Sequence, residues 1–315
     1  MHDAVHFKPR CCWSNPHIQT LWPSLFRRTP HVATQRERIE LPDGDFLDLD
    51  WDENAQGPIA IIFHGLEGSS NSSYVRGLMA ALNQAGWRTV AMNFRGCSGE
   101  PNRLPRAYHS GETGDIGFII NLLQQRNPNT TITAIGFSLG GNALLKYLGE
   151  TGQNSKLSAA VAVSVPFDLN NAALTLRKSG LGIYQNHLLK NLKASVLHKQ
   201  RLLGSIIDID AALNAKNFHE FDHLVTAQLH GFRGVDDYYA QSSSNQYIPA
   251  IRSQTLILHA QDDPFLDKSA IPELNNIPAS VKLATSKHGG HVGFIGEQGY
   301  WLEQRIPAFL NDIKK

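Results

Sequence analysis

The chain has 315 residues, 42% of them hydrophobic, so it can bury a large core as one α/β domain with an insertion or as two average domains. Its 29 basic and 28 acidic residues give a net charge of +1 with no basic stripe, which argues against a nucleic-acid partner. The N-terminus lacks the apolar core of a signal peptide and no apolar stretch could span a bilayer, so we expect a cytoplasmic protein.

Residues 1–35 predict an irregular arm that lies on the rest of the protein. Four apolar side chains are expected to anchor it by burial: Trp13, Trp22, Leu25 and Phe26. Disorder is the less favoured interpretation, because these side chains need to be covered. The arm offers no amphipathic cationic helix of convincing length, so membrane association is not predicted.

The three cysteines, Cys11, Cys12 and Cys97, offer no disulfide framework, because a bridge between adjacent cysteines would be strained. Free thiols are typical of a reducing compartment. Cys97 follows an apolar run, and we interpret it as a packing residue rather than as a second nucleophile.

Residues 36–41 and 46–51 predict a hairpin around the turn 42–45. From residue 59 onward short apolar strands alternate with helices, which predicts a mostly parallel sheet with right-handed crossovers, flanked by helices. The expected strands are 59–63, 88–94, 131–137, 157–165, 255–259 and 281–284. The expected helices are 74–85, 113–126, 142–149, 236–243 and 300–313.

The alternation of strands and helices stops after Pro166. Residues 168–235 contain helix-like segments, among them 188–203, and no strong strand. We therefore predict one α/β domain over 1–315 with a helical cap inserted at about 168–235. An insertion at this place usually covers the active site.

The segment Gly136-Phe137-Ser138-Leu139-Gly140 matches G-x-S-x-G, the nucleophile elbow. It stands between an apolar strand and a helix, which is the context that the motif needs. The turn is too sharp for side chains at its flanks, and it places the Ser138 hydroxyl at the positive end of the following helix. This arrangement indicates acyl-transfer chemistry with Ser138 as nucleophile.

A serine hydroxyl needs a base and an acid that orients the base, and in this architecture the order is serine, acid, histidine. Strand 255–259 leads into Asp262 and Asp263, at the strand end where such sheets collect catalytic groups. Asp263 is favoured as the acid, since the acid commonly takes the fourth position after the strand. Asp262 is the alternative, and Asp168 is a third candidate.

The segment after the last strand, His288-Gly289-Gly290-His291, holds two candidates for the base. His291 is favoured, because glycines on both sides let its loop fold over the sheet edge. The oxyanion hole should consist of two backbone N–H groups, those of Leu139 and Leu66. His64, next to the loop that contains Leu66, is interpreted as a residue that holds this loop.

His219, Glu220 and His223 match H-E-x-x-H, the zinc signature of metalloproteases. Leu229 occupies the position of the third histidine of the extended form, and so short a pattern arises by chance in a chain with 14 histidines. We interpret the segment as a face of a cap helix and expect no metal. The glycine-rich stretches lack nucleotide-binding spacing, so no cofactor is expected.

Many motifs in collinear order resemble the bacterial YheT-type hydrolases of the α/β-hydrolase superfamily, with more distant relatives of the ABHD type. Among them are NPHIQTLWP, HGLEGSSNSSY, NFRGCSGEPNR, YHSGETGD, GFSLGGN, FDHLVTAQLHGF, HAQDDPFLD and HGGHVGFIG. The resemblance covers nearly the whole chain. It implies Ser138, Asp263 and His291 as the charge-relay set, places FDHLVTAQLHGF in the cap and gives His219 no catalytic role.

The sequence therefore predicts a serine hydrolase, and specifically a carboxylesterase that acts on short- to medium-chain esters through an acyl-enzyme. A thioesterase, a lipase or an acyltransferase would use the same triad. A non-catalytic ligand-binding protein on this fold is the alternative from another class. The expected partner is a small ester or lipid-like molecule, and no oligomeric state is predicted.

Overall fold

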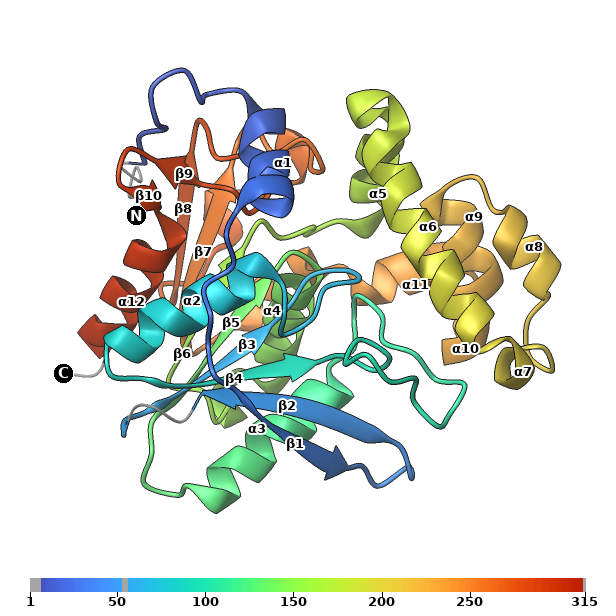
Figure 1. The fold of residues 1–315 in the computed structure, drawn as a ribbon, viewed down its shortest axis with the longest axis horizontal. Helices are drawn as coiled ribbons and strands as arrows, with labels where there is room; N and C mark the ends of the chain where they lie inside the picture. The colour runs from blue at the N-terminus through green and yellow to red at the C-terminus, as the bar shows by residue number, and fades with distance from the viewer. Residues whose placement is uncertain (1–6, 53–55, 314–315) are drawn as a thin grey trace.

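An eight-stranded sheet forms the centre of the computed structural model, which describes residues 7–52 and 56–313 (Figure 1). The strand order is β1-β2-β4-β3-β5-β6-β7-β8. β2 pairs antiparallel with β1 and β4, and the pairs from β4 to β8 are parallel. The strands are β1 Gln35–Glu40, β2 Phe46–Asp52, β3 Ile59–Phe63, β4 Arg88–Asn93, β5 Ile132–Phe137, β6 Ala159–Val163, β7 Gln254–Ala260 and β8 Val281–Ser286. The short strands β9 Ile295–Gly296 and β10 Gly299–Tyr300 form a separate antiparallel pair.

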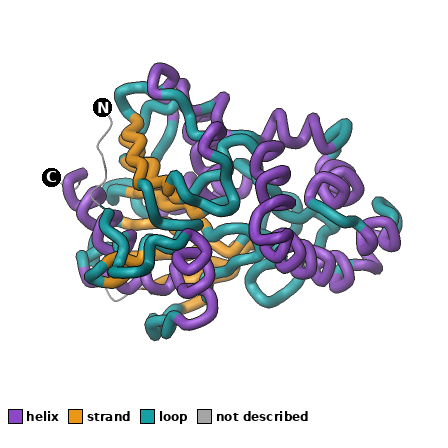
Figure 2. Tube along the Cα trace, turned by 90° about the horizontal axis from the view of Figure 1, so that it is seen from above, coloured by secondary structure: helices purple, strands orange, loops and turns teal. Residues whose placement is uncertain are grey.

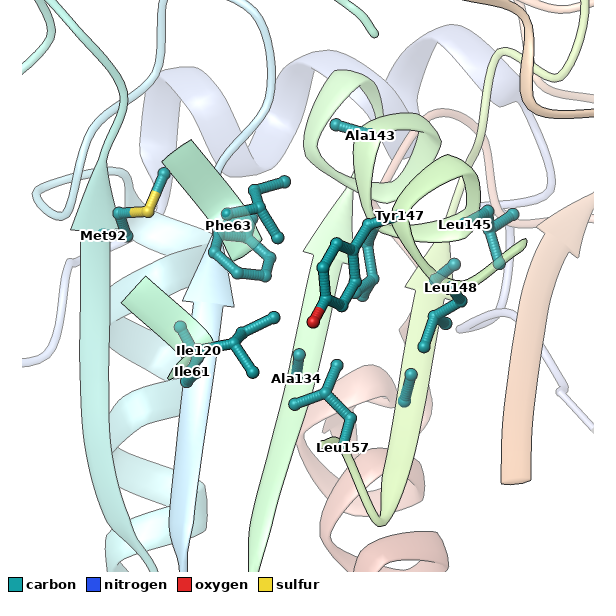
Figure 3. Close-up of a cluster of buried hydrophobic side chains, with 14 of the residues drawn as sticks. Ile61, Phe63, Met92, Ile120, Ala134, Ala143, Leu145, Tyr147, Leu148 and Leu157 are labelled. Atoms are coloured by element: carbon teal, nitrogen blue, oxygen red, sulfur yellow. The ribbon is translucent and has the colours of Figure 1, made fainter. Parts of the chain in front are cut away.

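The central strands are apolar along their whole length because both faces of the sheet are covered. Every residue of β3, β5 and β6 is buried, as continuous apolar runs in parallel sheets usually are. α2 (Ser73–Gln84) and α12 (Leu302–Ile313) pack on one face. α3 (Gly114–Arg126) and α4 (Leu139–Thr151) pack on the other, where Leu145, Tyr147 and Leu148 of α4 lie against the strands (Figure 3). The predicted fold class is confirmed.

A group of helices connects β6 to β7, and all of them except the last, α11, lie within the segment predicted as an insertion. Seen from above, these helices gather on one side of the molecule, away from the strands (Figure 2). They are α5 Leu169–Lys178, α6 Ile183–His198, α7 Gln200–Leu203, α8 Ile209–Asn214, α9 Phe218–Phe221, α10 Ala227–His230 and α11 Val235–Ser242. Leu189, Val196 and Phe218 belong to a hydrophobic cluster formed mainly by these helices.

The N-terminal arm differs from its prediction in two respects. Residues 1–6 of the arm lie outside the described residues, and 16–26 form a helix, α1 (Pro16–Phe26), rather than an irregular segment. Asn15 caps this helix by accepting bonds from the N–H groups of His17 and Ile18. The predicted anchors Leu25 and Phe26 are largely exposed, and the residues that α1 buries are Gln19 and Thr20.

A buried arginine ties the β1–β2 turn to the centre of the fold. Arg95, just after β4, donates two hydrogen bonds to Asp115 at the start of α3, at 2.7 and 2.8 Å. Its third nitrogen lies 2.8 Å from Asp43 and 3.3 Å from Asp45. The Asp45 side chain is fully buried and also accepts a hydrogen bond from Asn102. One cation therefore compensates three carboxylates from two separate segments.

We predict that Arg95→Met lowers the free energy of unfolding by about 3–5 kcal/mol, because it leaves buried carboxylates without their cation. Urea unfolding followed by circular dichroism measures the change. Arg103→Met is the matched control, since Arg103 pairs with Glu40 at the surface and such pairs contribute about 1 kcal/mol or less. Equal losses for the two variants would contradict this account of Arg95.

Candidate active site

Ser138 stands at the sharp turn between β5 and α4, with φ 49° and ψ −117°. The backbone segments around this turn pass very close to one another. A Cβ on Gly136 would lie 2.4 Å from the carbonyl oxygen of Gly140, and a Cβ on Gly140 would lie 2.5 Å from that of His64. Both positions therefore require glycine, and the turn holds Ser138 at the N-terminus of α4.

Three side chains from separate loops meet at this turn. His291 Nε2, in the loop after β8, lies 3.0 Å from Ser138 Oγ. His291 Nδ1 lies 2.8 Å from Oδ2 of Asp263, which follows β7 and has a fully buried side chain. The other carboxylate oxygen of Asp263 accepts the N–H of Phe265, whose ring stacks on His291 at 4.2 Å between centroids. The structure thus places a serine hydroxyl, an imidazole and a carboxylate in one hydrogen-bonded chain.

The alternative candidates form a pair of their own. Asp262 Oδ2 lies 3.1 Å from His288 Nδ1, and Oδ1 of Asp262 accepts the N–H of Gly290 at 3.0 Å. Burial raises the pKa of Asp262. This second aspartate–histidine pair fixes the base of the loop that carries His291. Asp168, the third candidate acid, caps α5 by accepting the N–H of Asn171 at 2.9 Å.

The loop after β3 is held on both sides of Leu66. The N–H of Gly65 donates to the Tyr74 hydroxyl at 2.9 Å, and that of Glu67 donates to the Tyr108 hydroxyl at 2.7 Å. His64 donates from Nδ1 to the carbonyl of Gly65 and accepts the N–H of Phe94 at Nε2, as expected of a residue that holds the loop. Burial lowers the pKa of His64 to about 4.

Two backbone N–H groups are candidates for binding an oxyanion. Leu139 is the first residue of α4, so its N–H has no partner within the helix. Leu66 lies between the two fixed amides of its loop, and both leucines border the same cavity as Ser138. The site also depends on residues to which the sequence analysis gave no role, above all Tyr74, Tyr108 and Phe265. The motifs that contain them do not indicate which atoms they contact.

Helix α1 supports the histidine loop through polar contacts. The Thr20 hydroxyl accepts the N–H of His291 at 2.9 Å. The Gln19 side chain donates to the carbonyl of Ile295 at 3.1 Å and accepts its N–H at 2.6 Å. These bonds explain why α1 buries two polar residues, and they place the N-terminal segment directly behind the base.

A cavity of about 490 Å³ opens beside Ser138 and His291. Apolar side chains from the helices between β6 and β7 form much of its wall: Leu169, Ala172, Leu176, Leu188, Leu192, Phe218 and Phe221. The wall also contains polar side chains, among them Asp222, which accepts hydrogen bonds from Thr226 and Tyr239. Burial raises the pKa of Asp222 to about 6. Asp222 begins a π-helix, Asp222–Thr226, a distortion found frequently at functional sites.

Comparison with known proteins agrees with this geometry. A model of the alpha/beta hydrolase fold family matches residues 58–298. The chain belongs to the alpha/beta hydrolase fold family. It is 44% identical to "Putative esterase YheT" of Escherichia coli over 98% of this chain and 94% of that protein. Phospholipase ABHD3 of Mus musculus is 32% identical over 93% of this chain and 73% of its own. The expected resemblance to YheT-type hydrolases is confirmed.

The likeness extends to solved structures. An esterase of Pyrococcus furiosus, Pf2001, superposes with a TM-score of 0.61 at 17% identity and covers 99% of each chain. At this identity the likeness supports the fold alone. The family and the curated relatives together show that this protein is a hydrolase of the esterase and lipase type. None of the helices among residues 7–52 and 56–313 has the length and apolar character to cross a bilayer.

The H-E-x-x-H segment of this hydrolase does not present a zinc-binding arrangement. Glu220 accepts the backbone N–H of Lys216 and a side-chain N–H of Asn217, so its carboxylate caps the start of α9. His219 lies 3.6 Å from Asp236 at the surface. In the described part of the chain no group of three histidines, cysteines or carboxylates is placed to hold a metal ion.

The cysteines of the hydrolase are free thiols within the described structure. Cys97 borders a second cavity of about 300 Å³ that shares Tyr108, Leu192, Phe221 and Thr226 with the wall of the first. Burial raises the pKa of the Cys97 thiol, so it is uncharged and a poor nucleophile at neutral pH.

We predict that His259→Leu reduces the acid sensitivity of folding. Burial lowers the pKa of His259 to about 4 from the ordinary 6.5, and its Nδ1 has no hydrogen-bond partner. As the pH falls from 6.5 toward 4, the unfolded chain takes up a proton on this imidazole and the folded protein does not, so the free energy of unfolding falls. Between pH 7 and pH 5 this one group accounts for a loss of about 2 kcal/mol.

Urea unfolding of the wild type and of His259→Leu at the two pH values measures the difference. The exposed His223→Leu is the control, because that imidazole contacts water in the folded and in the unfolded state. If the free energy of unfolding falls equally for His259→Leu and the wild type between pH 7 and pH 5, the buried neutral imidazole is not the cause of the acid sensitivity.

Proposed function

We propose that this protein is a serine hydrolase, and specifically a carboxylesterase for short- to medium-chain esters. The observation that carries the proposal is the chain of hydrogen bonds from Ser138 through His291 to Asp263, placed beside an apolar cavity. In such a chain the imidazole removes the proton of the hydroxyl, and the carboxylate fixes the ring and stabilises its charged form.

In the proposed reaction Ser138 Oγ attacks the ester carbonyl while His291 Nε2 takes its proton. The carbonyl oxygen becomes an oxyanion, which the N–H groups of Leu66 and Leu139 stabilise. His291 then gives its proton to the leaving alcohol, and an acyl group stays on Ser138. Water then attacks the acyl carbon while His291 takes one of its protons. The bond from the acyl carbon to Ser138 Oγ breaks, His291 returns the proton to this oxygen, and the acid leaves. Apart from substrate and water, these steps use only residues of the chain.

We further propose that the chain is a single α/β-hydrolase domain, with 1–35 as an arm packed on it and about 168–235 as a cap. The cap proposal rests on the cavity, because helices of this segment supply much of its apolar wall. The dimensions of that wall would then select among acyl groups. Thioesters and acyl acceptors other than water would fit the same triad, and the substrate panel below separates thioesters from esters.

We predict that the wild type hydrolyses p-nitrophenyl esters and that Ser138→Ala loses this activity by at least about 10⁴-fold in kcat, as removal of a nucleophile does. The same panel includes acyl-CoA thioesters and lipid esters. A fluorophosphonate probe should label the wild type at Ser138 and leave the variant unlabelled. Folded wild-type protein that neither labels nor turns over any substrate would favour the non-catalytic ligand-binding alternative.

We predict that Asp263→Asn lowers kcat by about 10⁴-fold, because the amide no longer stabilises the imidazolium or fixes its tautomer. Asp262→Asn is the matched control. It removes a neighbouring carboxylate that pairs with His288, so kcat should change by less than about tenfold. The esterase assay with both purified variants measures these effects. A larger loss in Asp262→Asn than in Asp263→Asn would reverse the assignment of the acid.

A further inference from the structure

Helix α1 exposes five large apolar side chains, and the two residues that it buries are polar. The two residues that it buries, Gln19 and Thr20, are bonded to the histidine loop. Five large apolar side chains of the helix are exposed instead: Ile18, Leu21, Trp22, Leu25 and Phe26. Leu25 is 67% exposed and Phe26 is 63% exposed. A helix facing water normally has the opposite arrangement, so this face is suited to contact with something apolar.

The turn between α5 and α6 presents a second apolar feature. Gly180, Leu181 and Gly182 all have positive φ, at 54°, 54° and 78°. A leucine seldom adopts this conformation, because its Cβ crowds the backbone. Here Leu181 is 96% exposed, and Ile183 after it is 64% exposed. No contact within the described chain accounts for a leucine held outward in this way.

These two apolar segments lie on either side of one opening. Leu25 and Ile183 both border the cavity that contains Ser138, and both are largely exposed, so the cavity reaches the surface between them. The segments also contact each other, since His17 Nδ1 lies 2.8 Å from the Tyr184 hydroxyl. In Figure 1 α1 and the upper ends of α5 and α6 lie at the same side of the molecule.

The distribution of exposed apolar side chains is uneven over the described residues. Eleven large hydrophobic side chains are exposed there, and eight of them belong to α1, to α5, to the turn after α5 or to the first residue of α6. Basic residues accompany them: Arg28 follows α1, and Arg177 and Lys178 end α5 just before the outward turn, all three exposed. An apolar patch with an adjacent basic margin matches the interfacial region of a membrane that contains anionic lipids.

We propose that α1 and the α5–α6 turn form a docking surface for an anionic lipid bilayer, and that lipid esters enter the cavity from that surface. This proposal rests on the proposed function, because that function identifies the cavity as the substrate site. A protein partner or a second copy seated on the same face would close the opening to Ser138. A lipid surface covers the patch and at the same time supplies the molecules that the cavity accepts.

The test is co-sedimentation with vesicles, one kind of phosphatidylcholine alone and the other of phosphatidylcholine with phosphatidylglycerol. It uses the full chain with Ser138→Ala, so that binding is measured without hydrolysis of the lipid. We expect binding to the anionic vesicles, and weaker binding to the neutral ones. Binding to neutral vesicles that equals or exceeds binding to anionic ones would overturn the assigned charge preference and with it the proposal.

The decisive variant is Leu181→Asn with Phe26→Gln in the same background. Asparagine adopts positive φ readily and glutamine is a good helix former, so the fold should persist, as thermal melting will verify. Burial of one such side chain changes an equilibrium constant by about tenfold or more, so the pair should weaken binding to anionic vesicles by roughly 100-fold. Leu202→Gln with Ile206→Asn removes two exposed apolar side chains elsewhere among the helices, and we expect that control to bind like the parent.

Three results would overturn the docking surface. They are absence of binding to anionic vesicles, equal binding by the decisive variant and the parent, and self-association in sedimentation velocity that the decisive variant abolishes while no vesicles bind. The soluble-ester assay reports on the proposed function separately. Failed vesicle binding with intact soluble-ester hydrolysis refutes the docking surface alone, and failed hydrolysis and labelling with intact vesicle binding refutes the esterase.

Discussion

Two backbone segments pass beneath Ser138 so closely that no side chain fits between them. Glycines at 136 and 140 allow β5 to turn directly into α4, and the turn keeps Ser138 in a backbone conformation that residues with side chains seldom adopt. That conformation costs free energy, and the burial of β3, β5 and β6 compensates this cost. The side chains of these strands pack on both faces of the sheet and keep the turn in place. The turn fixes the Ser138 hydroxyl between the histidine loop and the loop after β3. The positions of these two loops are important for the site only because the hydroxyl is fixed there.

The loops around the turn are held in place by different kinds of contact. The histidine loop is held by a second aspartate–histidine pair and by polar side chains of α1. The loop after β3 is held by two tyrosine hydroxyls and by a buried neutral imidazole. Such preorganisation suits the proposed acyl transfer, in which the groups that stabilise the oxyanion need to stand in place before charge develops.

Much of this arrangement could be predicted from the sequence. The alternation of strands and helices indicates a parallel sheet, and strand ends of such a sheet meet at one edge. That rule, with the order serine, acid and histidine, brings Ser138 together with an aspartate after β7 and a histidine after β8, and the position after the strand favours Asp263. The proximity of the alternative pair Asp262 and His288 also follows from strand ends, and only coordinates separate the two pairs.

The errors concern residues whose surroundings come from distant parts of the chain. The prediction that Leu25 and Phe26 are buried rested on their apolar character alone, and it was wrong because Gln19 and Thr20 have specific polar partners near the other end of the sequence. The hydroxyl contacts of Tyr74 and Tyr108 are equally invisible in a linear pattern. The chemical character of a side chain predicts whether it tends to be buried. The contacts that the fold brings together determine whether it is buried in this protein.

The hydrogen bond from His291 to Thr20 joins residues 271 positions apart. During synthesis α1 precedes the loop that it supports, and its two buried polar residues can at first bond to the nearby carbonyls of Trp13 and Pro16. Their bonds to His291 and Ile295 can form only after β8 has been made. The support that α1 gives to the histidine loop is therefore completed late, when the strands of the sheet are already available.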